Sequence, residues 1–144
     1  MNRLLLTAAA VCALAFASLA LAGTRTREYV GTIEPDSDMK FETLVRHRVI
    51  EKVEHFSWGA RRGVKVHCAE GPIFSAGGFD GPMRVRDNRF HGTLVGPDGA
   101  KVHVTGRFRH HGREATGTFR IHGDISDMRT DCHTGGRDWT AARI

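Results

Sequence analysis

The chain has 144 residues, of which 40% are hydrophobic and 26% charged, and its formal net charge is +5. This length suits one domain that buries a core behind a short leader. The charge is modest, so it favours solubility and nonspecific attraction to anions, and it identifies no specific partner.

The first 22 residues have the pattern of a secretory signal peptide. A single positive charge at Arg3 precedes an apolar run over 4–16, and Ala20-Leu21-Ala22 is a small-x-small cleavage pattern. An uncleaved anchor is the alternative, but the run is alanine-rich, barely long enough to span a bilayer and not followed directly by a basic cluster. We therefore predict a signal peptide over 1–22, a single secreted or cell-envelope domain over 23–144, and no membrane span after cleavage.

Removing the leader with its Cys12 leaves Cys68 and Cys132 as a pair. In an exported protein an even pair predicts a disulfide. The bond would close a loop of about 65 residues and stabilise the fold by about 4 kcal/mol. A reactive thiol or a cysteine–histidine metal site is the alternative that the oxidising compartment disfavours.

The first half of the domain alternates short strand-like runs with turn residues. Residues 27–33 predict a strand, and the turn residues over 34–38 end it. Residues 39–58 are ambiguous, because their apolar positions also suit a helix. Since they are rich in β-branched residues and lack a helix N-cap signal, we favour two strands, Met39–Val45 and Val49–Trp58. Residues 64–68 predict a further strand, followed by a glycine-rich loop over 69–81.

Residues 89–122 predict a three-stranded meander whose register follows from its turns. Pro97-Asp98-Gly99 suits a three-residue hairpin loop, and the next turn falls at 110–113. The pairs on the predicted inner face are Phe90 with Gly106, Gly92 with Val104, Leu94 with Val102, Phe108 with Ala115, Gly106 with Gly117, Val104 with Phe119 and Val102 with Ile121. All these residues are apolar or glycine, so turn chemistry and period-2 patterning agree.

The opposite face of the meander is basic and is the best candidate for a binding surface. The register places Arg89 opposite Arg107, His91 opposite Thr105, and Thr93, His103 and Arg120 in one row. It also places Arg109 opposite Glu114, a favourable pair. A solvated sheet face is the plain interpretation. The functional one is a shallow site for anionic polysaccharide or another cell-envelope component, formed by Arg89, His91, His103, Arg107 and Arg120. Nucleic acid is not expected, because few aromatics interleave with these charges.

Metal and catalytic chemistry have weak support. No His-x-His or His-Glu-x-x-His spacing is present. The Asp36/Asp38 pair and the loop aspartates Asp124, Asp127 and Asp131 are incomplete calcium candidates. No nucleophile elbow or phosphate loop occurs, although Asp80 and Asp87 would suit a glycosidase pair if they met. We predict a non-catalytic module with no cofactor, with a hydrolase or a metal- or calcium-binding module as the alternative.

The C-terminal segment combines Cys132, a Gly-Gly turn and Trp139. Its pattern is Cys132-x-Thr134-Gly135-x-x-x-Trp139-Thr140-Ala141-x-Arg143, and it follows Tyr29-x-Gly31, Val104-x-Gly106-x-Phe108 and Ala115-Thr116-Gly117-Thr118 in the chain. This order resembles a group of small secreted bacterial β-domains with a leader, two cysteines and a glycine-punctuated meander. The resemblance covers nearly all of the chain after the leader. It implies an all-β fold and carries over no activity, ligand or site residue; the arginine and histidine load of the meander's outer face departs from it.

These observations predict one all-β domain of about eight to nine antiparallel strands, a sandwich or partly closed barrel with one disulfide. The last strand should pair with residues 29–33. Trp139 should point inward and fill the space beside Gly92, Gly106 and Gly117.

Overall fold

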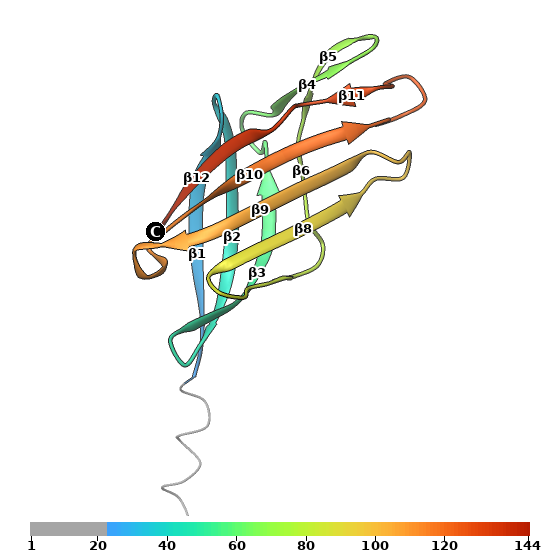
Figure 1. Cartoon of the computed structure of the whole chain (residues 1–144). Coiled ribbons are helices and arrows are strands. Elements are labelled where there is room, and N and C mark those ends of the chain that lie inside the picture. Colours follow the sequence, from blue (N-terminus) through green and yellow to red (C-terminus); the bar gives the residue numbers. More distant parts are fainter. Residues whose placement is uncertain (1–22) are drawn as a thin grey trace, which may run out of the picture.

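The computed structural model describes residues 23–144, and the predicted signal peptide over 1–22 lies outside that part of the chain. Figure 1 shows a fold built almost wholly of β-strands. The elements are β1 (Thr24–Ile33), β2 (Ser37–Arg46), β3 (Val49–Trp58), β4 (Val64–Cys68), β5 (Gly71–Ser75), β6 (Gly77–Gly78), β7 (Met83–Arg84), β8 (Arg89–Val95), β9 (Lys101–Arg109), the 3-10 turn η1 (His110–Gly112), β10 (Glu114–Gly123), β11 (Cys132–His133) and β12 (Arg137–Arg143). Within residues 23–144, no helix has the length and apolarity to cross a membrane.

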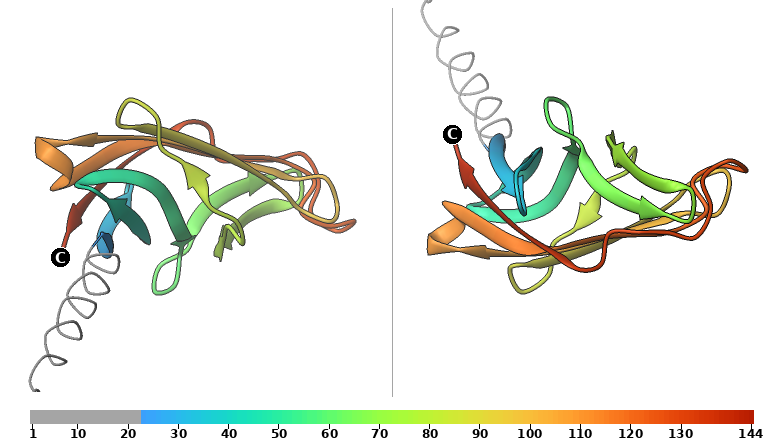
Figure 2. Two further views of the ribbon diagram at one scale, coloured as in Figure 1. Left: turned by 90° about the horizontal axis from the view of Figure 1, so that it is seen from below. Right: turned by 90° about the horizontal axis from the view of Figure 1, so that it is seen from above.

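All strands belong to one antiparallel sheet. Its main path runs β5-β4-β11-β10-β12-β1-β2-β3-β6, with β7 also on β3 and with β9 and then β8 on the other edge of β10. This branch lets the sheet fold over on itself, so that β8–β10 and β1–β3 lie on opposite sides of the core (Figure 2). The sheet is not closed into a barrel, because β8 is paired along its length with β9 alone. The predicted all-β antiparallel fold with one disulfide is confirmed.

The predicted count of eight to nine strands is too low, since the described residues form twelve. The region 69–81, expected to be a glycine-rich loop, contains β5 and β6. Three strands, β6, β7 and β11, have only two residues each. Two residues cannot show the alternation by which a strand is recognised in a sequence.

The ambiguous stretch 39–58 forms the β2–β3 hairpin, as favoured from its sequence. His47 and Arg48 both have positive φ, 49° and 67°, as a two-residue type I′ turn requires. Part of the helix-like spacing comes from two bulges, which leave one extra residue in β3 opposite Phe41 and another after Ile50. Each extra residue turns a spacing of two into three, so Ile50, Val53 and Phe56 all face the core.

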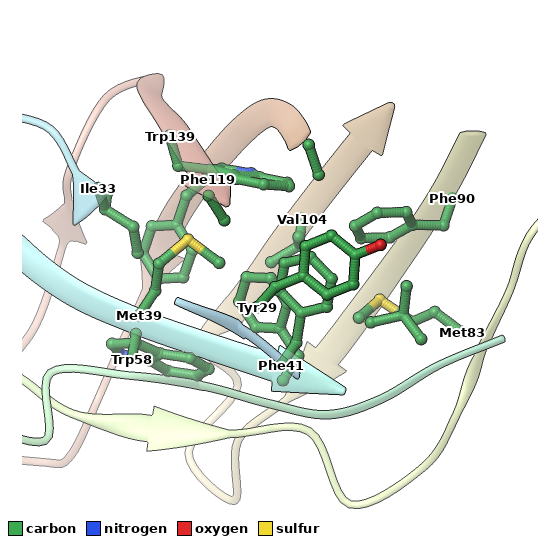
Figure 3. Close-up of a cluster of buried hydrophobic side chains, with 14 of the residues drawn as sticks. Tyr29, Ile33, Met39, Phe41, Trp58, Met83, Phe90, Val104, Phe119 and Trp139 are labelled. Atoms are coloured by element: carbon green, nitrogen blue, oxygen red, sulfur yellow. The ribbon is translucent and has the colours of Figure 1, made fainter. Parts of the chain in front are cut away.

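The core is filled mainly by aromatic rings. Figure 3 shows Tyr29, Phe41, Phe119 and Trp139 in this core. These four residues and Phe56 are all below 2% exposed. Tyr29 and Phe41 stack with ring centroids 4.7 Å apart, and Trp139 meets Phe41 edge-on at 6.0 Å. Such pairs add to the free energy gained from burial.

Trp139 is held between β1 and β10, which pair with the two edges of β12. The predicted pairing of the last strand with residues 29–33 is therefore confirmed, and Ile33 lies opposite Trp139. The indole Nε1 donates to the carbonyl oxygens of Thr105 (3.0 Å) and Thr118 (3.2 Å). The ring thus has both an apolar surrounding and partners for its one polar group.

The three inner-face glycines make room for three different side chains. A Cβ on Gly117 would lie 2.7 Å from Trp139 Cζ2, so this glycine accommodates the tryptophan as expected. A Cβ on Gly106 would overlap the ring of Phe90, and one on Gly92 would overlap the thioether of Met83. The atoms nearest to a Cβ on Gly92 or Gly106 thus belong to residues of β7 and β8 and not to Trp139, although the indole Nε1 reaches the carbonyl oxygen of Thr105, next to Gly106.

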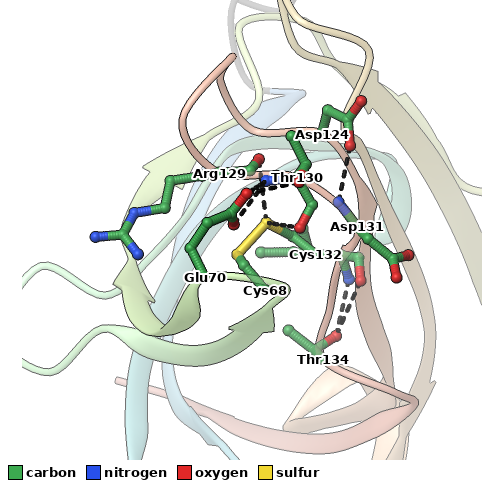
Figure 4. Close-up of a disulfide and its surroundings, with 9 residues drawn as sticks. Cys68, Glu70, Asp124, Arg129, Thr130, Asp131, Cys132 and Thr134 are labelled. Atoms are coloured by element: carbon green, nitrogen blue, oxygen red, sulfur yellow. Dashed lines mark hydrogen bonds between the residues drawn. A yellow bond between two sulfur atoms is a disulfide. The ribbon is translucent and has the colours of Figure 1, made fainter.

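The disulfide between Cys68 and Cys132 joins β4 to β11 (Figure 4). The segment before β11 is also joined to the turn after β4, because the Glu70 carboxylate accepts hydrogen bonds from Thr130 N (3.0 Å) and Thr130 Oγ1 (2.6 Å). Thr134 lies just beyond, and its Oγ1 accepts from the amide of Ile121 (2.9 Å). This end of the molecule is therefore fixed by a covalent bond and by side-chain hydrogen bonds to the backbone.

Candidate functional site

The predicted register of the meander is confirmed throughout β8, β9 and β10. Arg89 is opposite Arg107, His91 is opposite Thr105, and His103 lies between Thr93 and Arg120. The five candidate binding residues therefore project from the outer face, away from the aromatic core. Four of them are exposed, and His103 is half-buried.

A third arginine, which sequence reasoning missed, extends the pair on β8 and β9. Asp87 and Asn88 have φ of 50° and 58°, and Arg86 and Arg89 exchange backbone hydrogen bonds of 2.9 and 2.8 Å. This type I′ turn places Arg86 directly beside Arg89. Arg86, Arg89 and Arg107 thus lie side by side on three adjacent chain segments, and we call them the arginine row. The signal was present in the sequence, because Asp-Asn suits such a turn.

The charges of the arginine row are not neutralised within the described chain. The ion pairs among residues 23–144 join Arg46 to Glu51, Arg62 to Asp36, and His110 to Glu114. No carboxylate oxygen of this region therefore lies within 4.0 Å of the row. Like charges opposite one another destabilise a sheet, so this arrangement favours binding of an anion. Arg109 lies opposite Glu114 as predicted, but the ion pair that Glu114 makes is with His110, whose Nε2 lies 3.5 Å from Glu114 Oε2.

A cleft of about 1050 Å³ opens beside β8 and contains the arginine row. Arg84 from β7 adds a fourth guanidinium to the lining. Phe79, Met83, Phe90 and Leu94 supply apolar surface, and Asp80 is the one carboxylate among the lining residues. The cleft therefore presents positive charge around an apolar floor.

The other end of the basic face holds two stacked histidines beside Arg120 and Lys101. His103 and His122 stack with ring centroids 5.1 Å apart, and a 3.0 Å hydrogen bond joins Thr93 Oγ1 to His103 Nδ1. Desolvation lowers the pKa of His103, and the neighbouring His122, Arg120 and Lys101 lower it further. Sequence reasoning missed His122, although the register placed it diagonally from His103. The lowered pKa favours the neutral form of His103, so the fixed positive charge at this end comes from Arg120 and Lys101.

Two of the carboxylates considered for calcium binding, Asp38 and Asp124, accept hydrogen bonds from backbone amides of loops. Asp38 Oδ1 accepts hydrogen bonds from the amides of Arg61 (2.9 Å) and Arg62 (2.6 Å), and Asp124 Oδ1 accepts one from Asp131 N (2.8 Å). Burial pulls the pKa of Asp38 upward, but its hydrogen bonds from backbone amides outweigh this and lower it. Across residues 23–144, no three His, Cys, Asp or Glu side chains gather closely enough to hold a metal ion.

The two carboxylates considered for glycoside hydrolysis occupy different settings. Asp80 lines the cleft, whereas Asp87 lies in the turn between Arg86 and Arg89 and is not part of the lining. A glycosidase needs two carboxyl groups that flank the scissile bond. The lining of the cleft includes one carboxyl group, that of Asp80.

No family model matches this chain, and no curated protein or solved structure is significantly similar to it. The resemblance to small secreted bacterial β-domains therefore stays a prediction.

Proposed function

We propose that this protein is a non-catalytic, exported binding module that holds an anionic polysaccharide of the cell envelope on its basic sheet face. The observation that carries the proposal is the arginine row at the cleft beside β8. Three guanidinium groups lie there on adjacent segments with no carboxylate partner among residues 23–144.

A polysaccharide with sulfate or carboxylate groups suits both the charged residues and the neighbouring hydroxyl groups of this surface. Guanidinium groups bind such anions through paired, charge-assisted hydrogen bonds. The register continues the arginine row from Arg107 to Thr116 and then to Thr140. These threonines supply hydroxyl groups beside the charges, where the neutral hydroxyls of a sugar chain would lie.

Two other functions, nucleic-acid binding and hydrolysis, fit the surface less well. The outward-facing positions of β8, β9 and β10 carry no Phe, Tyr or Trp side chain, so bases of a single-stranded nucleic acid would find no stacking platform. A hydrolase would require a second carboxylate beside Asp80. Binding without cleavage is therefore the function that the residues support best.

Heparin-affinity chromatography of residues 23–144 tests this proposal. Arg89→Ala/Arg107→Ala should elute at clearly lower salt than the unaltered protein. The matched control, Arg46→Ala/Arg62→Ala, removes the same charge from two arginines that already have carboxylate partners. If both variants eluted at equally lowered salt, net charge alone would explain heparin binding, and a specific site would be contradicted. Preferential binding of single-stranded DNA over heparin would favour a nucleic-acid function instead.

A further inference from the structure

A second basic cleft lies next to the turn that carries Asp87 and Asn88. Its volume is about 810 Å³, and Asn88 is part of its wall. Four arginines line it from separate segments: Arg27 on β1, Arg48 in the β2–β3 turn, Arg109 at the end of β9 and Arg113 just before β10. Figure 1 shows that the start of β1, the β2–β3 turn and the η1 turn lie toward the same end of the molecule. No predicted site residue belongs to this group.

Arg27 lies against the η1 turn in the wall of this cleft. The residue is half-buried, and its Nη1 lies 3.7 Å from the point that a Cβ on Gly112 would occupy. Gly112 has a φ of 74° and is fixed by a 2.5 Å hydrogen bond from the Tyr29 hydroxyl to its carbonyl oxygen. The η1 turn therefore packs closely against the guanidinium. A guanidinium held in this way loses less conformational entropy on binding than a free surface arginine.

The charge of this cleft is also uncompensated. Its lining contains no Asp or Glu, and none of the ion pairs among residues 23–144 involves any of the four arginines. Glu114, the nearest acidic residue along β10, contacts His110. Four like charges that converge from four segments repel one another, and folding alone does not account for their convergence. A ligand with more than one negative charge would relieve that repulsion.

We propose that this second cleft binds a phosphate-bearing group. A phosphate monoester carries close to two negative charges at neutral pH and three strong acceptor oxygens, which several guanidinium groups can share. The wall also has an apolar part, formed by Val49, which is 62% exposed, and Ile50. A lipid phosphate and a free phosphate both have the required chemistry. This site is independent of the polysaccharide site on the arginine row.

The test uses residues 23–144 and the variant Arg48→Gly/Arg113→Ala. Arg48 has a φ of 67° in a type I′ turn, so glycine removes its charge and suits the backbone. Arg113 is exposed, so its truncation leaves the core intact. Arg89→Ala/Arg107→Ala is the matched control, because it removes two charges from the arginine row. Comparison of thermal unfolding midpoints checks that all three proteins are folded.

Binding is measured by co-sedimentation with vesicles that mix phosphatidic acid into phosphatidylcholine, and by the thermal shift that inorganic phosphate causes relative to sulfate. Vesicle binding should weaken about thirtyfold in Arg48→Gly/Arg113→Ala, since each basic residue near an anionic surface contributes about fivefold. The arginine-row control should bind nearly as well as the unaltered protein. A phosphate shift without vesicle binding, lost in Arg48→Gly/Arg113→Ala alone, would support the site and identify a soluble phosphate as its ligand. Absence of both signals, or equal losses in the two variants, would overturn the proposal.

Discussion

Replacement of Trp139 by alanine should be among the most damaging single changes in this fold. The indole is 1% exposed, and its ring lies about 6 Å from those of Phe41, Phe56 and Phe90. Truncation of a buried tryptophan typically lowers the free energy of unfolding by about 3–5 kcal/mol, because apolar burial is lost and a cavity remains. We expect a value near the upper end, since the carbonyl oxygens of Thr105 and Thr118 also lose the indole donor.

The Trp139→Phe variant separates these two contributions. It keeps most of the apolar ring but removes the N–H donor, so its loss should be about 2 kcal/mol, clearly below that of alanine. Equilibrium urea unfolding followed by far-ultraviolet circular dichroism is the suitable assay, because either change removes one of the two tryptophans that fluorescence would report. Val49→Ala, at a side chain that is 62% exposed, is the control and should change stability by less than about 0.5 kcal/mol. A loss below about 1 kcal/mol for Trp139→Ala would refute the reasoning.

Three further changes test other parts of the fold. Gly117→Ala should lower the thermal midpoint strongly, because its Cβ would overlap a backbone carbonyl of β9, whereas Gly136→Ala, with no atom within 4 Å of its Cβ, should not. Joint replacement of Cys68 and Cys132 by alanine should lower the free energy of unfolding by about 4 kcal/mol, and an unchanged urea midpoint would contradict this. The pKa of His103 is lowered in the fold, so the unfolded chain takes up its proton first, and stability should fall as the pH drops below about 6.5. In His103→Gln the urea midpoint should therefore fall less between pH 7 and pH 5 than in the unaltered protein. An unchanged pH dependence would show that His103 does not cause the loss of stability.

The register of the meander could be derived from the sequence because two kinds of signal agree there. Each strand of β8–β10 is long enough to show period-2 alternation, and the hairpin turns fix which residues are opposite. A shift of one residue would bury arginines and expose phenylalanines. The outer-face positions of Arg89 and Arg107 followed from the same register.

The parts that were ambiguous or missed lack such agreement. In β3 the bulges break the alternation, so Ile50, Val53 and Phe56 mimic a helix. The strands β6, β7 and β11 are defined by pairing with distant partners, and two residues carry no pattern of their own.

The candidate site could also be predicted only in part. The basic face could be placed from local pairing, but its cleft also needs Phe79 and Arg84, which β7 and the segment before it bring beside β8. The convergence of Arg27, Arg48 and Arg113 likewise depends on how β1, the β2–β3 turn and η1 meet in space. Charge composition indicated an affinity for anions; only the folded chain shows where the charges gather.

The most direct test of the polysaccharide proposal is a nuclear magnetic resonance titration of ¹⁵N-labelled residues 23–144 with a sulfated oligosaccharide. The arginine Nε–Hε signals report guanidinium contacts individually, and single arginine substitutions assign them. The proposal predicts that the signals of Arg86, Arg89 and Arg107 shift together and saturate, while those of Arg46 and Arg62 stay in place. Uniform small shifts across all arginines, or saturable shifts confined to residues outside the arginine row, would contradict it.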